Sequence, residues 1–323
     1  MIRTFRLDQN DFQELSEGPI AERLLEANWI DAYDLDDDDR EALKPFLADE
    51  LPANTDIEEI ESSARFFTDT DGLHVHSLFL SRNEGKHQTN TVVFILQSQR
   101  LLSLREDDLA DFRLFRLRAR RGQTEAHSPQ SLIVTLFEQK VENLADSIED
   151  MHRDLEQVSH MVLEIEDADL EEAIDRLAKV EDSVGKIRLC LMDTQRSLYF
   201  LIRHLRYHAE LQEQAKEALQ DVEVLMSHST FLSDKVNFLM DTTQGFINIE
   251  QNQIIKIFSI ASVVFLPPTM IASIYGMNFH VMPELDWSFG YPMAIGLMAL
   301  SGISPYLYSV SYTHLTLPTI YSV

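Results

Sequence analysis

The chain has 323 residues, enough for one large domain or two of ordinary size, and carries 54 acidic against 27 basic side chains. The formal net charge of −27 repels polyanions, which argues against a nucleic-acid partner, and it concentrates counter-cations around the protein. The single cysteine, Cys190, excludes an intrachain disulfide and fits a reducing compartment or indifference to redox. The first 30 residues mix charges throughout and lack a signal-peptide core, so the N-terminal part is expected to stay in the cytosol.

Residues 1–128 are predicted to form a cytosolic domain of mixed α and β structure. The segment DLDDDDREALKPF, residues 34–46, has the form of an N-capped helix with carboxylates at its positive end. Apolar runs on either side of Asp71 and Gly72 indicate a β-hairpin, and TVVFILQSQRLLSLRE, residues 91–106, repeats that arrangement.

Three motifs in this domain have alternative interpretations. DTDG at 69–72 is similar to the start of a calcium loop, but the later ligands are missing, so a hairpin turn is favoured. His74 and His76 fall on one face of a strand and could hold a metal, although the sequence offers no evident third ligand. The basic segment FRLFRLRARR, 112–121, is expected to pair with acidic helices further along the chain rather than with RNA or lipid headgroups.

Residues 129–208 are predicted to form a long antiparallel helical hairpin. Apolar positions recur in steps of four and three from Val141 to Ile165, EDAD at 166–169 interrupts them, and a second seam runs from Leu170 to Leu205. Between residues 138 and 182 there are 16 carboxylates and only four Lys or Arg. The outer faces of this hairpin are therefore strongly acidic.

A third helix is predicted over 209–275, entering a membrane at about 254. Residues 257–275 carry no charge and match the roughly 20 residues that cross hydrocarbon. After a loop at 276–290, a second span is expected at 291–310, and no Asp, Glu, Lys or Arg follows Trp287. The alternative, a buried core hairpin of a soluble protein, is disfavoured because two such segments end a very acidic chain. Pro267 and Pro268 remove backbone donors, which a span packed among neighbours or lining water tolerates.

A stripe of small or polar residues follows one face of this third helix. In steps of three, four or seven it comprises Asp241, Asn248, Asn252, Ile255, Ser259, Ser262, Leu266, Thr269 and Ser273. Polar atoms inside a bilayer usually face a bundle interior or water, although hydrogen bonding between helices by Ser and Thr is an alternative explanation. Asp241 and Asn252 favour a pore.

The stripe ends at YGMNF, residues 275–279. With the N-terminus in the cytosol, the last carbonyls of the helix face outward, and several copies around an axis would form an electronegative mouth without fixed charge. Gly276 suits a helix C-terminus, and Asn278 adds a neutral amide oxygen. Such oxygens suit Mg²⁺, which keeps its waters. No phosphate-binding Gly loop, HExxH or nucleophile–base arrangement is found, so an enzyme is not predicted.

YGMNF with MPELDWSFGYP resembles the signature of the CorA family of magnesium and cobalt transporters, and NIEQNQIIKIFSIASVVFLPPT resembles its pore helix. The likeness is detailed over 236–308 and looser elsewhere, where SARFF, FRLFRLRAR and RLCLMDTQR resemble the proteobacterial branch. The resemblance implies a homopentamer with a cytosolic funnel of α+β and hairpin structure and two C-terminal transmembrane helices per chain. It implies a multi-pass protein of the inner membrane that takes up Mg²⁺, with Co²⁺ and Ni²⁺ as further ions.

By the same resemblance, Gly276, Met277 and Asn278 form the outer selectivity ring. Asn252 and Thr269 would be polar pore rings, Ile255 and Leu266 apolar constrictions, and Asp241 a carboxylate ring near the cytosolic entrance. Regulatory Mg²⁺ sites are expected between subunits, with the candidates Glu213, Glu217 and Asp221; the alternative is that these are solvated surface acids. Zinc efflux and a membrane-tethered scaffold without a pore are the competing functions. The tail at 311–323 lacks the family's basic end and is similar to translated adapter sequence rather than to evolved protein.

Overall fold

The computed structural model describes residues 1–8, 11–47, 65–83, 85–124, 126–165, 168–278, 280 and 282–315. The chain divides into two compact units, Met1–Asp241 and Thr242–Val323, and one helix runs through the boundary between them. Of the segments discussed above, residues 63–64, 166–167, Phe279, Val281 and 316–323 lie outside the described part of the chain.

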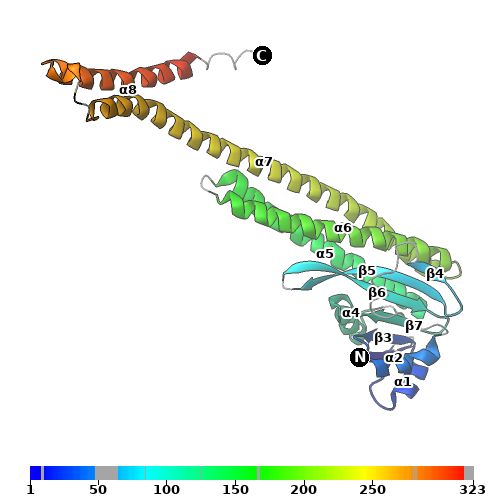
Figure 1. Ribbon diagram of the computed structural model, residues 1–323. Helices are drawn as coiled ribbons and strands as arrows, with labels where there is room; N and C mark the ends of the chain where they lie inside the picture. Colours follow the sequence, from blue (N-terminus) through cyan, green and yellow to red (C-terminus); the bar gives the residue numbers. More distant parts are fainter. Residues whose placement is uncertain are drawn as a thin grey trace. The chain divides into compact units, whose positions relative to one another are not determined.

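Seven strands of the described residues form one sheet in the order β2-β1-β3-β7-β6-β5-β4 (Figure 1). Neighbouring strands are antiparallel except β3 and β7, which pair in parallel. The strands are β1 Ile2–Asp8, β2 Asp11–Glu14, β3 Trp29–Tyr33, β4 Phe66–Thr68, β5 Leu73–Asn83, β6 Lys86–Leu96 and β7 Leu101–Arg105.

Both predicted β-hairpins are present. β4 and β5 pair with Thr68 opposite Leu73, and β6 and β7 pair with Leu96 opposite Leu101. In the first turn Gly72 has φ +143°, and a Cβ there would collide with the carbonyl oxygen of Leu96. Only glycine fits that backbone and that close approach.

The sheet is buried on both faces because apolar residues occupy both sets of alternating positions. On one face Val92 and Phe94 join a core that includes α4 (Ala110–Arg120) and the long helices. On the other face Val93 and Ile95 pack with α1 (Ile20–Glu26) and α2 (Asp37–Leu43), which a short 3₁₀ helix η1 (Lys44–Phe46) follows. The predicted N-cap of α2 is present, and the structure assigns it to Asp36, whose side chain accepts a hydrogen bond of 2.7 Å from the Asp39 N–H.

The helical hairpin is formed by α5 (Pro129–Glu164) and α6 (Leu170–His204), which lie side by side (Figure 1). Ser128 closes a capping box at the start of α5, and Asp169 caps α6. The first seam is buried from Val141 to Val162 and the second from Ala173 to Leu205, whereas Ile165 is exposed beyond the end of α5. The heptad pattern therefore predicted the buried face correctly.

The basic segment 112–121 falls on α4, and its predicted pairing with the acidic hairpin holds for Arg118, which lies 2.7 Å from Glu142 of α5. Arg116 instead reaches the buried Asp31 of β3 at 2.7 Å and Asp108 at 3.0 Å. Arg120 pairs with Glu14 of β2. The prediction was wrong for these two arginines because α4 packs on the sheet and meets its carboxylates first.

The helix α7 (Ala209–Tyr275) is 67 residues long and continues through Pro267 and Pro268. Among the described residues it is the one helix long and apolar enough to cross a membrane. A 3₁₀ helix η2 (Pro283–Asp286) follows, and then α8 (Gly290–Leu315), 26 residues with no Asp, Glu, Lys or Arg. α8 starts one residue before the predicted span and extends past its expected end at 310.

α8 packs closely against α7 beside the two prolines. A Cβ added at Gly302 would lie 3.4 Å from Cγ of Pro268 and 3.6 Å from the carbonyl oxygen of Val264. The absence of a side chain at this point therefore allows the two helices to approach.

Candidate ion pathway and its acidic groove

The second half of α7 carries a belt of large apolar side chains that this chain alone leaves uncovered. Ile257, Phe258, Phe265 and Met270 are each 66–69% exposed. A water-soluble chain does not present so continuous an apolar surface, so lipid or further helices must cover it.

The predicted stripe lies on this same helix and remains in register because α7 does not break at its prolines. Its predicted pore-lining members from Asp241 to Thr269 are exposed. The Thr269 hydroxyl donates to the Phe265 carbonyl oxygen of its own helix at 2.7 Å, so this threonine is hydrogen-bonded without a neighbouring helix. The exposed face is thus available to other copies of the chain or to water.

The helix α7 ends directly before Gly276, Met277 and Asn278, the GMN motif. The N–H of Gly276 donates to the Ala272 carbonyl oxygen at 2.9 Å, and that of Met277 donates to Ile274 at 3.3 Å, which tightens the last turn. The backbone of Gly276 is not left-handed; a Cβ there would lie 3.1 Å from the Ala272 oxygen, so glycine suits this turn through close approach. Gly276, Met277 and Asn278 are all exposed.

Two of the three regulatory candidates line a groove between α7 and α5. Glu217 and Asp221 of α7 share this cavity, of about 410 Å³, with Glu138 and Glu142 of α5. Its other lining residues are Val141, Ala145, Ala218, Val224 and Leu225. Glu213 does not line the groove and pairs with Lys216 at 3.0 Å.

Sequence reasoning missed Glu138 and Glu142 as members of this groove. Both lie on the predicted acidic outer face of the hairpin, where many carboxylates look alike. Only the packing of α5 against α7 selects them. We name the cluster of Glu138, Glu142, Glu217 and Asp221 the acidic groove.

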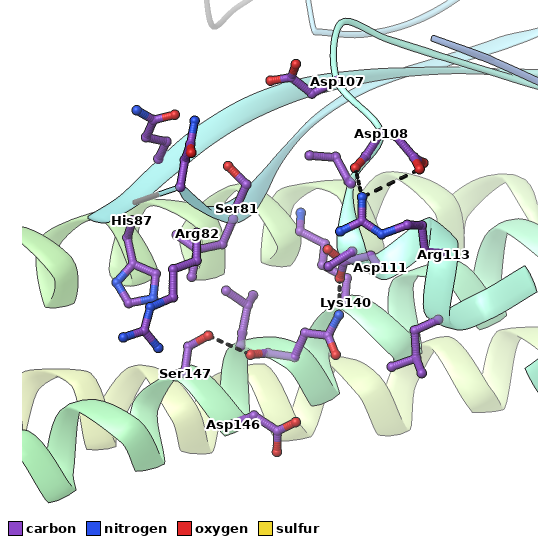
Figure 2. Close-up of a pocket in the computed structure, with 18 of the residues that line it drawn as sticks. Ser81, Arg82, His87, Asp107, Asp108, Asp111, Arg113, Lys140, Asp146 and Ser147 are labelled. Carbon is purple, nitrogen blue, oxygen red and sulfur yellow. Dashed lines mark hydrogen bonds and ion pairs between the residues drawn. The ribbon is translucent and has the colours of Figure 1, made fainter. Parts of the chain in front are cut away.

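A larger cavity of about 540 Å³ lies between the β5–β6 hairpin, α4 and α5 (Figure 2). At its floor Asp111 is buried and accepts a hydrogen bond from Asn143, and burial raises the pKa of Asp111 to about 6. Lys140 is buried beside it and donates to the Ser77 hydroxyl at 2.8 Å, with Asp193 3.7 Å away. Burial lowers the pKa of Lys140 even though Asp193 acts to raise it.

The charged groups around this cavity serve to join elements. Asp193 of α6 accepts hydrogen bonds from the Ser77 hydroxyl and from the Leu78 N–H of β5, at 2.6 and 2.7 Å. Arg65 lies 3.3 Å from the same carboxylate. The arrangement anchors the helical hairpin to the sheet, which is the structural role that buried and fully bonded charges most often have.

These features define a membrane protein in which an α/β domain and a helical hairpin are joined to a long membrane-spanning helix. The family model described as CorA-like Mg²⁺ transporter protein matches residues 25–308. The chain therefore belongs to the CorA family, as the GMN signature predicted.

Two curated relatives are similar over almost their whole length. The magnesium transport protein CorA of Escherichia coli strain K12 is 50% identical over 310 residues, which cover 95% of this chain and 98% of the relative. The protein of the same name from Salmonella typhimurium strain LT2 is 49% identical over the same lengths.

Solved structures show the same fold. The complete CorA magnesium transporter of Methanocaldococcus jannaschii matches with a TM-score of 0.72 at 18% identity, covering 95% of this chain and 96% of that one. The cytoplasmic domain of ZntB from Vibrio parahaemolyticus matches with a TM-score of 0.57 at 13% identity, over 76% of this chain and 97% of that one. The predicted fold class, an α+β domain with a long hairpin and a long helix in a membrane protein, is thus confirmed.

Proposed function

We propose that this chain assembles as a homopentamer in the inner membrane and takes up Mg²⁺, with Co²⁺ and Ni²⁺ as further ions. The observation that carries the proposal is α7 itself: an unbroken helix that bears an exposed polar stripe and ends at Gly276-Met277-Asn278. The 50% identity to a magnesium transport protein over nearly the whole chain supports the choice of ion.

In this proposal five copies of α7 surround the pathway. The Asn278 amide oxygens and the carbonyl oxygens that end the helices hydrogen-bond a hydrated Mg²⁺ at the outer mouth without removing its waters. α8 is the second crossing: 26 residues of helix span roughly 39 Å, more than the hydrocarbon thickness of about 30 Å. The N-terminal unit then lies in the cytosol.

The test of the outer ring is Mg²⁺ flux into proteoliposomes that contain an internal Mg²⁺-sensitive dye. Asn278→Ala should abolish flux while the assembled protein elutes at the wild-type size, because only the outer oxygens are lost. His280→Ala, at an exposed position in the same loop, is the matched control and should transport normally. Normal flux through Asn278→Ala, or rescue by it of a magnesium-transport-deficient cell at low Mg²⁺, contradicts the selectivity role.

The same assay separates the competing functions. Wild-type protein that moves Zn²⁺ outward and not Mg²⁺ inward would favour zinc efflux. Wild-type protein that conducts no divalent ion would favour a scaffold.

We also propose that cytosolic Mg²⁺ closes the pathway by binding at the acidic groove. The membrane potential drives a divalent ion inward with about 4.6 kcal/mol per 100 mV, so uptake without feedback would overfill the cell. Glu217 and Asp221 share the groove with Glu138 and Glu142, and the pairing of Glu142 with Arg118 compensates only part of this like charge. Bound Mg²⁺ would relieve the remaining repulsion and favour the conformation in which the carboxylates are close.

The gating test uses the separation of Glu213 from the groove. Glu217→Gln with Asp221→Asn should weaken Mg²⁺-dependent protection from proteolysis and leave the pathway active at millimolar internal Mg²⁺. Glu213→Gln alone is the control and should behave as wild type, because Glu213 pairs with Lys216. If the double variant keeps the wild-type Mg²⁺ dependence of protection and inhibition, the sensor lies elsewhere.

A further inference from the structure

The turn between β4 and β5 brings together metal-ligating side chains from two sequence motifs that the proposed function does not use. The first motif is the DTDG segment, and the second is the pair of histidines on β5. Phe67 of β4 lies opposite His74 of β5, so the chain reversal returns His74 to the turn. Asp69, Asp71 and His74 consequently each place one ligand atom within 4.8 Å of the others.

The Asp69 carboxylate and the His74 imidazole are already held in place by hydrogen bonds and packing. Asp69 accepts hydrogen bonds from the N–H groups of Asp71 at 2.8 Å and Gly72 at 3.1 Å. His74 is 8% exposed, stacks on the Phe67 ring at 4.3 Å and has Nε2 3.0 Å from the Asp69 carboxylate. Little side-chain freedom remains to be lost on binding.

A second, independent observation is the state of His76. This residue follows His74 on the same face of β5, its ring lies 5.9 Å from the Phe67 ring, and it is only 4% exposed. Among the described residues its Nδ1 has no hydrogen-bond partner, which is costly for a buried polar atom.

We propose that Asp69, Asp71 and His74, with His76 as an adjacent nitrogen donor, bind a transition-metal ion such as Zn²⁺, Co²⁺ or Ni²⁺ on the α/β domain. Two carboxylates with imidazole nitrogen suit these ions, whereas Mg²⁺ prefers an all-oxygen octahedron. On binding, His74 Nε2 offers its lone pair to the metal and the imidazole keeps its proton on Nδ1; an imidazole protonated on both nitrogens releases one proton to solvent. The side chains converge by rotation until metal–ligand distances are about 2.0–2.2 Å.

The site differs in chemistry from the proposed Mg²⁺ pathway and from the acidic groove, both of which offer only oxygen. The α/β domain can therefore bind a transition metal while Mg²⁺ occupies the other sites. This property distinguishes the two kinds of site in an experiment.

The test is equilibrium dialysis of the full-length protein in detergent against Zn²⁺ with millimolar Mg²⁺ present throughout. The wild-type protein should bind one more Zn²⁺ per chain than Asp69→Asn or His74→Gln does. In each variant the affinity of the turn for this additional Zn²⁺ should be at least about tenfold lower than in the wild type. Asn at position 69 still offers an oxygen to the two turn N–H groups, so the hairpin is retained. Zn²⁺ should also raise the unfolding temperature of the wild type and not of the variants.

Asp36→Asn is the matched control, because it makes the same chemical change at a helix N-cap where Asn is an equally good residue. This variant should bind Zn²⁺ as the wild type does. Equal Zn²⁺ stoichiometry and equal thermal shift in wild type, Asp69→Asn and His74→Gln would overturn the proposal and leave the turn as a hydrogen-bonded hairpin only. Complete displacement of the bound Zn²⁺ by Mg²⁺ would overturn it as well.

Discussion

The buried carboxyl group of Asp111 makes a prediction about how stability depends on pH. Asp111 lies on α4 and accepts a hydrogen bond from Asn143 of α5, and burial raises its pKa from 3.8 to about 6 even though Asn143, Lys140 and Arg105 act to lower it. The folded state therefore holds the proton more tightly than the unfolded state does. The stability from Asp111 is fully present below pH 3.8 and is lost as pH rises through about 6.

Asp111→Asn removes this loss because an amide does not ionise, while its oxygen can still accept from Asn143. A shift of about two units at 1.36 kcal/mol per unit gives about 3 kcal/mol that the wild type loses and the variant keeps. We therefore expect the unfolding temperature of the unit Met1–Asp241 to be higher in Asp111→Asn than in the wild type at pH 7.5. This difference should exceed the corresponding difference at pH 4 by roughly 6–12 °C.

Fluorescence of the fully buried Trp29 during heating of the full-length protein, measured in a Trp287→Phe background that removes the second tryptophan, reports the unfolding of this unit. His76 acts in the opposite direction: burial depresses its pKa, so its contribution is lost as pH falls from 6.5 to about 4. Comparison of variant with wild type at each pH cancels that contribution. Asp146→Asn, an exposed position on the same cavity, controls for the change in charge. If the difference between Asp111→Asn and wild type is the same at pH 4 and pH 7.5, the reasoning is wrong.

Three further predictions follow from packing. Gly302→Leu should reduce the yield of folded, membrane-inserted protein, because the leucine side chain would separate α8 from α7. Gly296→Leu is the control and should leave the yield unchanged, because a Cβ at Gly296 meets nothing within 4 Å. Equal yields of the two variants would contradict the contact at Gly302. Cys190 is buried and burial raises its thiol pKa to about 12, so a maleimide should label it only after denaturation, and rapid labelling of native protein would refute this core packing. Ile148→Ala in the buried seam should cost about 2–5 kcal/mol in thermal unfolding, while Leu163→Ala at an exposed position should stay within about 0.5 kcal/mol; comparable losses would disprove the seam.

The parts of the fold that the sequence predicted are those governed by local periodicity. The two heptad seams located the buried faces of α5 and α6, and Asp71-Gly72 located a tight turn, because each depends on residues close together in the chain. The N-cap at Asp36 is of the same kind.

Contacts between distant residues could not be obtained in this way. Asp31 pairs with Arg105 and with Arg116, 74 and 85 residues away, and those pairs decided where the basic segment of α4 points. The acidic groove likewise requires α5 and α7 to meet, and the Asp69–His74 cluster requires the register of β4 against β5. No short pattern carries that information, because many carboxylates along the chain have equivalent local surroundings.

The paired prolines of α7 have a consequence for hydration. Pro267 and Pro268 have no N–H, so the carbonyl oxygens of Val263 and Val264 lack the backbone donor that normally lies four residues further along a helix. These oxygens lie 11 to 12 residues before Tyr275, roughly 16–18 Å along the axis from the end of α7. In the proposed crossing, which ends at Tyr275, that depth is close to the middle of a hydrocarbon layer about 30 Å thick, where an oxygen without a donor costs several kcal/mol. The proposed crossing therefore requires water or a neighbouring donor near the centre of the bilayer at this point.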